Sequence, residues 1–395
     1  MQILLSIVTV VVMILTSFFN GFVAEKPADL EIADPDTAFN AELSTADTLL
    51  LEGIYTSELA WLAYTQLDNG AIPMTGNKNG EVTVNPYFAD IAALALLTDA
   101  ENYADEVKSY MEWHFEHLNT AATDYNGVDG TIYDYTLTVE NGKVTAENVT
   151  NGEPSYDSTD SYAATFLTVV NAYYEATADK EYIVSRSRDI IRIAEAMLST
   201  YSFGLTNAKP DYAVKFLMDN CEVYEGALAA AALLNTIGVS EFADMLTLKK
   251  CEYAAKTVAQ SIENVLWNAE GGYYEAGIFA DGTAAFAFSW DEFYPCATAQ
   301  LFPIIHGLIG VDTVRARNLY DSFCEAYNWE NYDIPSEFCW GSNVLAAAIM
   351  GDADSVVSYM RFYALDAIDH AYPLYNADIA RVALAAHTML EKNAE

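Results

Sequence analysis

Two carboxylates stand three residues apart at the start of a strongly apolar stretch. Residues 156–167 read Tyr-Asp-Ser-Thr-Asp-Ser-Tyr-Ala-Ala-Thr-Phe-Leu, so Asp157 and Asp160 precede the apolar run and Tyr162 follows them. One acid is enough to cap a helix, whereas two nearby carboxylates repel unless they share a proton, a ligand or a substrate. A pair of this kind can supply the acid and the base that cleave a glycosidic bond, although each acid alone equally fits a helix cap.

Acids and aromatic residues also gather where other apolar stretches begin. Tyrosine and tryptophan offer a flat apolar face and a polar tip, which suits the binding of a pyranose ring. We therefore predict a carbohydrate as the partner of this chain. The candidate substrate-binding residues are Asn85, Tyr87, Asp90, Tyr133, Tyr162, Asp219, Glu222, Tyr224, Trp290, Asp291, Glu292 and Trp340.

Helices must position these side chains, because apolar residues recur at three- and four-residue spacing along the chain. Wholly apolar helices alternate with amphipathic ones, as expected if inner helices pack on all sides and outer helices keep a polar face. This alternation favours an all-α fold, a closed (α/α)6 toroid of helical hairpins, over an open solenoid, whose fixed sequence period is missing. The expected helices span 41–67, 87–97, 102–118, 157–175, 181–200, 212–234, 241–267, 293–308, 312–327, 337–350, 353–365 and 377–391.

In such a ring every second helix begins at the same end, so the starts of the inner helices converge on one mouth. Two small β-hairpin inserts are expected on the same rim. Residues 130–146 contain Asn141-Gly142 between β-rich runs, which is a strong hairpin signal. Residues 271–288 combine Gly-Gly, Asp-Gly and alternating aromatic residues, which predicts a second hairpin.

The run Asp157-x-x-Asp160-x-Tyr162-Ala163-Ala164 is similar to the acid-rich start of an inner helix in the six-hairpin glycosidases, nearest to family eight glycoside hydrolases and their amylolytic clostridial relatives. The resemblance implies an (α/α)6 barrel over residues 40–390, with Asp157 or Asp160 serving the sugar or the attacking water. Those enzymes carry a catalytic glutamate just before the second helix, where this chain has Asn85-Pro86-Tyr87. The proton donor would then be Glu81, Glu58 or another carboxylate of the rim.

The first hypothesis is an exported glycoside hydrolase acting on a glucan-like polysaccharide or oligosaccharide, with Asp157, Asp160 and Glu81 as catalytic candidates. The second is a non-catalytic barrel that binds glycan at the cell surface and has lost the catalytic acid. A third is a sugar epimerase or lyase, but those enzymes rely on histidine or tyrosine with arginine, and arginine is scarce near the candidates.

Composition excludes other classes. With 57 acidic and 18 basic residues the chain has a formal charge of −39, which repels nucleic acid and anionic lipid. The motifs of phosphate loops, dinucleotide sites and serine-hydrolase elbows are missing, so no cofactor is implied. We expect no metal either: His114 and His117 better fit a solvated or capping helix face, and the five cysteines form no Cys-x-x-Cys pair.

Residues 1–24 are apolar and are followed at once by polar residues, which indicates a signal peptide cleaved near Ala24 or, alternatively, an uncleaved anchor. Residues 25–39 are expected to form a linker and 40–393 the barrel domain. The predicted location is extracellular or at the cell surface, with membrane attachment only through the N-terminal segment.

Overall fold

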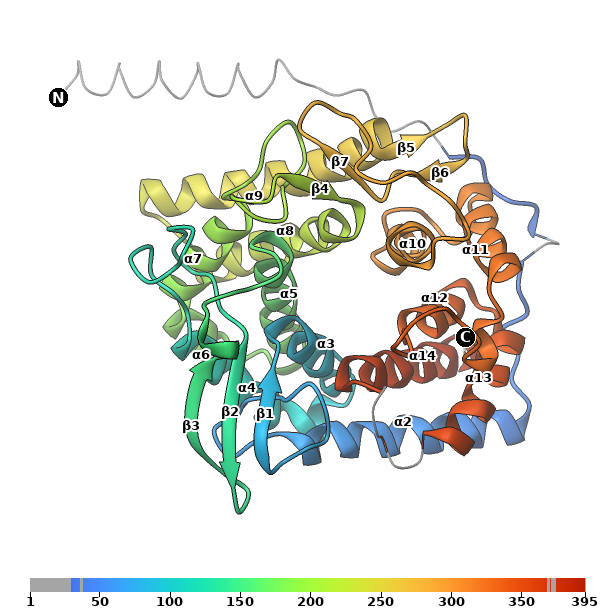
Figure 1. The fold of residues 1–395 in the computed structure, drawn as a ribbon, viewed down its shortest axis with the longest axis horizontal. Coiled ribbons are helices and arrows are strands. Elements are labelled where there is room, and N and C mark those ends of the chain that lie inside the picture. The colour runs from blue at the N-terminus through green and yellow to red at the C-terminus, as the bar shows by residue number, and fades with distance from the viewer. Residues whose placement is uncertain (1–29, 36–37, 368–369, 371–373, 395) are drawn as a thin grey trace.

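The computed structural model describes residues 30–35, 38–367, 370 and 374–394. The predicted signal peptide at 1–24 and the first part of the predicted linker lie outside the described residues. From residue 38 onward the chain winds into a ring of helices whose inner and outer members alternate along the sequence (Figure 1).

Among the helices of the described residues, six form the inner ring and six the outer ring, and the short α6 (Lys180–Ser185) precedes the outer helix α7. This confirms the predicted (α/α)6 toroid. The inner helices are α3 (Pro86–Leu97), α5 (Asp160–Thr177), α8 (Leu217–Ile237), α10 (Phe302–Ile305), α12 (Ser342–Met350) and α14 (Asn376–Ala394). The outer helices are α2 (Thr45–Thr65), α4 (Ala100–Glu116), α7 (Ser187–Met197), α9 (Phe242–Ser261), α11 (Val314–Ala326) and α13 (Ala353–Asp366).

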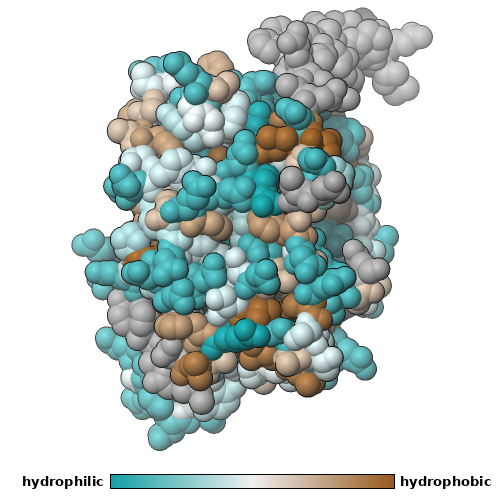
Figure 2. Space-filling view, turned by 90° about the vertical axis from the view of Figure 1, so that its right-hand side faces the viewer, coloured by the Kyte–Doolittle hydropathy of each residue, from teal (hydrophilic) through white to brown (hydrophobic). Residues whose placement is uncertain are grey.

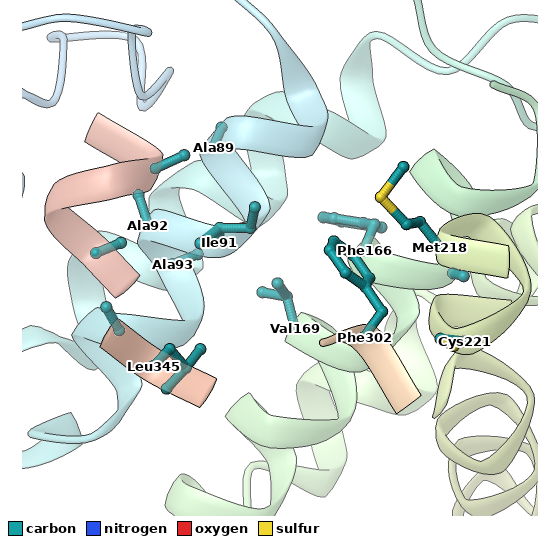
Figure 3. Packing of buried hydrophobic residues seen from close by; sticks show 14 of the residues in the cluster. Ala89, Ile91, Ala92, Ala93, Phe166, Val169, Met218, Cys221, Phe302 and Leu345 are labelled. Carbon is teal, nitrogen blue, oxygen red and sulfur yellow. The ribbon is translucent and has the colours of Figure 1, made fainter. Parts of the chain in front are cut away.

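Burial follows the sequence pattern. The inner helix α12 buries every residue except Ile349, which matches its sequence, apolar from Val344 onward. The outer helix α4 buries one stripe that includes Val107, Tyr110 and His114 at helical spacing, while its other face meets solvent. The inner helices meet in one buried cluster, where Phe166 of α5, Met218 of α8 and Phe302 of α10 lie near one another (Figure 3).

The inner helices α5 and α8 pack against each other, and at one point they touch backbone to backbone. Gly226 of α8 faces Ala164 of α5, and a Cβ atom at position 226 would lie 2.6 Å from the Cα of Ala164. Such a distance is far below van der Waals contact, so glycine is what permits this approach.

The described residues also form three small β-sheets, which lie in the connections between helices. The strands β1 (Gly80–Val84), β2 (Tyr135–Glu140) and β3 (Lys143–Val149) form an antiparallel sheet in that order. Its β2–β3 turn is the predicted Asn141-Gly142, with φ of 54° and 74°. The second predicted hairpin is confirmed in part, because the chain turns back at Asp281-Gly282 and Ile278 forms an antiparallel bridge with Ala284. In addition, β7 (Gly277–Phe279) pairs with β4 (Val214–Phe216), and β5 (Trp267–Asn268) pairs with β6 (Tyr273–Tyr274).

Some helix limits also differ from the prediction. The stretch 181–200 contains two helices, α6 (Lys180–Ser185) and α7, joined at Arg186. The stretch 293–308 contains a π-helical turn, η4 (Phe293–Ala297), before the short α10. Most important for the site, α5 begins at Asp160, so that Asp157 lies in the loop before the helix.

The outer surface is largely hydrophilic on the side where α11 and α13 lie, with separate apolar patches (Figure 2). Within the described ranges no helix has the length and hydropathy to cross a membrane. Nor does any group of three or more His, Cys, Asp or Glu residues in those ranges form a cluster able to hold a metal ion. His114 stacks on Phe166, and His117 pairs with Glu147 on the sheet.

Candidate active site

A cavity of about 690 Å³ lies at the end of the barrel where the inner helices begin. This volume falls within the range typical of small-ligand sites, about 300–1,000 Å³. Its walls come from the first turns of the inner helices and from the loops before them. The lining residues are Asn85, Tyr87, Phe88, Asp134, Asp157, Ser161, Tyr162, Met218, Asp219, Glu222, Phe293, Tyr294, Phe302, Pro335, Ser336, Glu337, Phe338, Trp340, Tyr375, Ala377, Asp378 and Arg381.

The structure brings together about half of the predicted site residues. Those that line the cavity are Asn85, Tyr87, Asp157, Tyr162, Asp219, Glu222 and Trp340. They come from the starts of α3, α5 and α8 and from the loop before α12, as expected if the inner helices share one mouth.

Other predicted residues lie outside the cavity lining. Glu81 is exposed on β1, opposite Thr138 of β2, because the strand holds it at the sheet and away from the mouth. Glu58, the other alternative proton donor, is buried on α2 and lies 2.6 Å from His370. Asp291 and Glu292 are exposed and lie in the turn that precedes η4.

Four more candidates are part of the packing. Asp90 sits one turn inside α3 with no exposed surface and accepts hydrogen bonds from Tyr110 (2.7 Å) and Thr165 (2.8 Å), so it joins three helices. Tyr133 is buried, and its hydroxyl donates to the carbonyl of Thr123. Trp290 packs edge-on against Phe288, and Tyr224 lies two residues beyond Glu222 on α8 without lining the cavity.

Asp160 is also absent from the lining. Its side chain has no exposed surface, and its Oδ1 accepts from the backbone N–H of Ser161 at 2.9 Å. Burial raises the pKa of this carboxyl to about 7, against the opposing effects of the Thr206 hydroxyl and the backbone donor. Asp157 and Asp160 therefore occupy two environments, one exposed at the cavity and one enclosed beside it.

Several lining residues were not among the predicted candidates. Asp378 and Arg381 belong to the first turns of α14, and Asp378 repeats the acid-at-helix-start signal found at other inner helices. Arg381 corrects the expectation that arginine is scarce near the site. Asp134 lies in the first predicted hairpin, just before β2, and nothing in the sequence marks it as distinct from other acids.

Asp134 is tied into the cavity wall by two neighbours. The side-chain amide of Asn85 donates to Asp134 at 3.0 Å and to the Tyr162 hydroxyl at 2.6 Å. The Tyr162 hydroxyl in turn donates to Asp134 at 3.1 Å. Burial, opposed by the Tyr162 hydrogen bond and assisted by the charge of Asp157, raises the pKa of Asp134 to about 7. Asn85, at the place of the expected glutamate, thus positions another carboxyl.

A second network lies on the wall formed by α8 and α14. The Tyr87 hydroxyl donates to Glu222 at 2.6 Å, and Arg381 donates to the same hydroxyl at 3.3 Å. Burial raises the pKa of Glu222, although the charges of His306 and Arg381 and the Tyr87 hydrogen bond oppose the rise. His306 itself lies 2.7 Å from Glu225, one turn further along α8.

Asp219, at the start of α8, is a carboxyl of the cavity wall whose surroundings disfavour its charged form. Burial raises its pKa well above the ordinary value, and the charges of Asp160, Glu222 and Asp157 raise it further. Asp157 is exposed, lines the same cavity and is therefore close enough to act on Asp219. A carboxyl group with a raised pKa beside an exposed carboxyl group is an arrangement capable of general acid and base chemistry.

Aromatic rings form a continuous arc around the cavity. Successive ring centroids lie 5.3 to 6.1 Å apart, which is normal contact for aromatic pairs. The arc runs through Tyr162, Tyr87, Phe88, Tyr375, Phe338, Trp340 and Tyr294. Such rings present flat apolar faces to whatever the cavity holds.

The ring of six helical hairpins is the fold of the six-hairpin glycosidases. A glycosidase variant superposes with a TM-score of 0.58 at 11% identity, covering 88% of this chain and 99% of that chain. An α-amylase from Clostridium perfringens gives a TM-score of 0.54 at 12% identity over 85% and 97% of the two chains. A GH63 mannosylglycerate hydrolase from Thermus thermophilus, solved with glucose, gives 0.53 at 12% identity over 86% and 100%.

No protein-family model matches the sequence, and no curated protein matches it. The likeness to solved structures therefore establishes the fold, and confirms the resemblance to six-hairpin glycosidases at that level. The nearer similarity to family eight stays a prediction.

Proposed function

We propose that this protein hydrolyses glycosidic bonds in a hexose-containing oligosaccharide or polysaccharide. The observation that carries the proposal is the cavity in which Asp219, with its raised pKa, and the exposed Asp157 lie beside an arc of aromatic rings. The names of the structural neighbours, an α-amylase and a mannosylglycerate hydrolase, support a hexoside as the substrate class.

In the proposed reaction Asp219 donates its proton to the glycosidic oxygen, and the leaving sugar departs as an alcohol. A water molecule attacks the anomeric carbon and gives up one proton to Asp157. The remaining O–H of that water becomes the new hydroxyl group on the anomeric carbon. The two carboxyl groups end with the proton exchanged between them, and exchange with solvent restores the starting state. The aromatic arc holds the sugar rings, and the Asn85 and Tyr87 networks keep the neighbouring carboxyls in place.

Substitution of the two acids separates their roles. On unactivated glucans, Asp219→Asn and Asp157→Asn should each lower kcat by about a hundredfold or more, the usual scale for a general acid or base. On glycosyl fluorides, whose leaving group needs no proton, Asp219→Asn should recover activity and Asp157→Asn should not. The measurement is the release of reducing ends and of fluoride by purified protein.

Glu81→Gln provides the matched control, because Glu81 is an exposed acid outside the cavity. We expect it to leave kcat unchanged. Full activity of Asp219→Asn on unactivated glucans would contradict the assignment, and loss of activity in Glu81→Gln would restore Glu81 as the proton donor.

A second candidate function is a barrel that binds glycan without cleaving it. It is favoured by one observation: the place before α3 holds Asn85, whose amide is fully engaged with Asp134 and Tyr162. Two measurements on a broad panel of α- and β-linked glucans test this function. If calorimetry shows that glucans bind, and no new reducing ends appear, binding without cleavage is selected over hydrolysis.

We also propose that the protein is exported through residues 1–24 and acts outside the cell or at its surface. The support is the apolar N-terminal stretch followed by polar residues. N-terminal sequencing of the protein from the culture medium and from the membrane fraction tests this proposal. A new N-terminus near residue 25 in the medium indicates cleavage near Ala24, and an intact N-terminus in the membrane fraction indicates a retained anchor. Protein found only inside the cell would contradict export.

A further inference from the structure

Three tyrosines with open side chains stand on the rim that surrounds the cavity. Their exposed fractions are 52% for Tyr294, 48% for Tyr212 and 43% for Tyr125. Tyr125 lies between α4 and α5, Tyr212 between α7 and α8, and Tyr294 in η4 between α9 and α10, so each follows an outer helix and precedes an inner one. Because inner helices all begin at the mouth, the three side chains lie at the same end of the barrel.

The three tyrosines belong to a row of contacts that starts inside the cavity. Tyr294 lines the cavity, and its ring lies 5.3 Å from that of Trp340 in the aromatic arc. The Tyr212 ring lies 6.1 Å from that of Phe216, and the Phe216 ring lies 5.8 Å from that of Phe286, in the segment that leads to Tyr294.

The row continues from Tyr212 to Tyr125 across a direct contact between two loops. The amide of Asn126 donates to Asp211 at 3.2 Å, so the residues next to Tyr125 and Tyr212 touch. Asp211 also adds, after burial and Tyr156, to the raised pKa of Tyr125. Residues 118–134 and 199–216 therefore touch next to Tyr125 and Tyr212.

Packing fixes these rings before any ligand arrives. The Tyr125 ring lies 5.0 Å from Tyr156 and 6.1 Å from Tyr133, and the Tyr212 ring lies 6.1 Å from Phe216. The loop that carries Tyr125 is also anchored, because Arg192 of α7 donates to the carbonyl of Asn119 and to Asp129. A preformed platform loses little conformational entropy on binding.

We propose that Tyr294, Tyr212 and Tyr125 form an outer binding track for a neutral glycan chain, whose end occupies the cavity while its following sugar units cross the rim. This inference rests on the proposed function and specifies its substrate as a chain longer than the cavity holds. Amphipathic tyrosine rings suit sugar faces, and the neighbouring Asn126 and Asp211 supply groups for sugar hydroxyls. The surrounding negative charge disfavours an anionic chain.

Chain-length dependence tests the track. With the linear series from maltose to maltooctaose as the probe, kcat/KM of the wild-type protein should rise with chain length. Tyr212→Ala and Tyr125→Ala should each lower kcat/KM for the longest substrates by about three- to tenfold, the effect of one aromatic contact, and much less for the shortest. Thermal melting of each variant checks that the fold is intact.

Phe242→Ala is the matched control, since Phe242 is an exposed aromatic residue (64%) at the start of the outer helix α9, the opposite end of the barrel. It should leave the chain-length profile unchanged. Equal losses at every chain length in Tyr212→Ala, or no loss at any, would overturn the track and leave hydrolysis standing.

Binding to the Asp219→Asn protein separates the two proposals. Calorimetry should show that the Asp219→Asn protein binds maltooctaose. The double variant Asp219→Asn/Tyr212→Ala should bind it about three- to tenfold more weakly, whether or not the wild-type protein cleaves the substrate. If nothing is cleaved and this loss is still seen, the track holds and hydrolysis fails. If maltose and maltooctaose bind with equal affinity, the track fails.

Discussion

Asp157 and Asp160 show how much the surroundings of a carboxyl group decide its chemistry. Only two residues separate them, yet one is exposed in the cavity and the other has no exposed surface. The cause is local, because α5 begins at Asp160 and Asp157 belongs to the loop before it. The sequence shows the pair, but the helix start that separates them depends on how the loop packs.

Asp160→Asn should make stability less dependent on pH. The folded-state pKa of about 7 lies above the unfolded value of about 3.9, so the folded protein holds the proton more tightly. Stability contributed by this group is present below about pH 4 and is lost as the pH rises toward about 7. The variant avoids that loss while keeping an oxygen for the Ser161 N–H.

The gain in unfolding free energy from Asp160→Asn should therefore be near zero at about pH 4 and reach on the order of 2–4 kcal/mol at about pH 8. Urea denaturation at several pH values measures it. A gain that is the same at every pH would show that the Asp160 carboxyl is not held protonated. Asp281→Asn is the control: this exposed acid has its pKa lowered by Thr283, so no such gain is expected.

At the scale of elements, the alternation of apolar and amphipathic helices predicted the ring because burial itself alternates between its two layers. The limits of short or irregular elements were harder. The stretch 293–308 looked like one helix, but Pro295 and Pro303 lack the N–H that a continuous helix needs, and the chain forms η4 and the short α10 instead. Pairing of β7 with β4 joins segments more than sixty residues apart, which local patterns do not encode.

The candidate site was about half predictable for a related reason. Residues at inner-helix starts, such as Asp219 and Glu222, were found because the ring geometry dictates where they converge. Asp134 reaches the cavity from a loop and Tyr294 from the irregular turn η4, and the paths of such segments depend on contacts such as that of Asn85 with Asp134. Asp90 was misjudged because an acid one turn inside an apolar helix looks the same in sequence whether it faces a cavity or bonds to Tyr110.

Gly226→Ala should destabilise the barrel through the contact between α5 and α8. The new Cβ would lie 2.6 Å from both Cα and Cβ of Ala164, and neither backbone can move without disturbing the inner ring. We expect a loss of about 1–3 kcal/mol in unfolding free energy, typical of overpacking. Differential scanning calorimetry or chemical denaturation measures the change.

Gly53→Ala in the outer helix α2 is the matched comparison, because a Cβ there meets nothing within 4 Å. Alanine should stabilise that helix by about 0.5–1 kcal/mol through its better helix propensity. If both variants changed stability in the same direction and by the same amount, helix propensity rather than close packing would explain Gly226.

At the scale of the whole molecule, the formal charge of −39 works against compactness through mutual repulsion. Salt screens this repulsion, since the Debye length falls from about 30 Å at 0.01 M to about 3 Å at 1 M. The melting temperature should therefore rise by several degrees between these concentrations of sodium chloride. Sodium chloride and potassium chloride should act alike, whereas an effect seen with only one cation would indicate specific binding rather than screening.

The first and last helices of the barrel, α2 and α14, pack against each other, and the backbone N–H of Leu43 donates to Asn393 at 2.8 Å. The contact between α2 and α14 closes the ring, so we expect the ring to form wherever along it the two ends of the chain lie. A circular permutant that joins residue 394 to residue 40 through a short linker and opens between Asn141 and Gly142 should fold into the same barrel. Its new ends would lie at an exposed turn, and the genetic beginning of the chain would no longer coincide with any hairpin boundary.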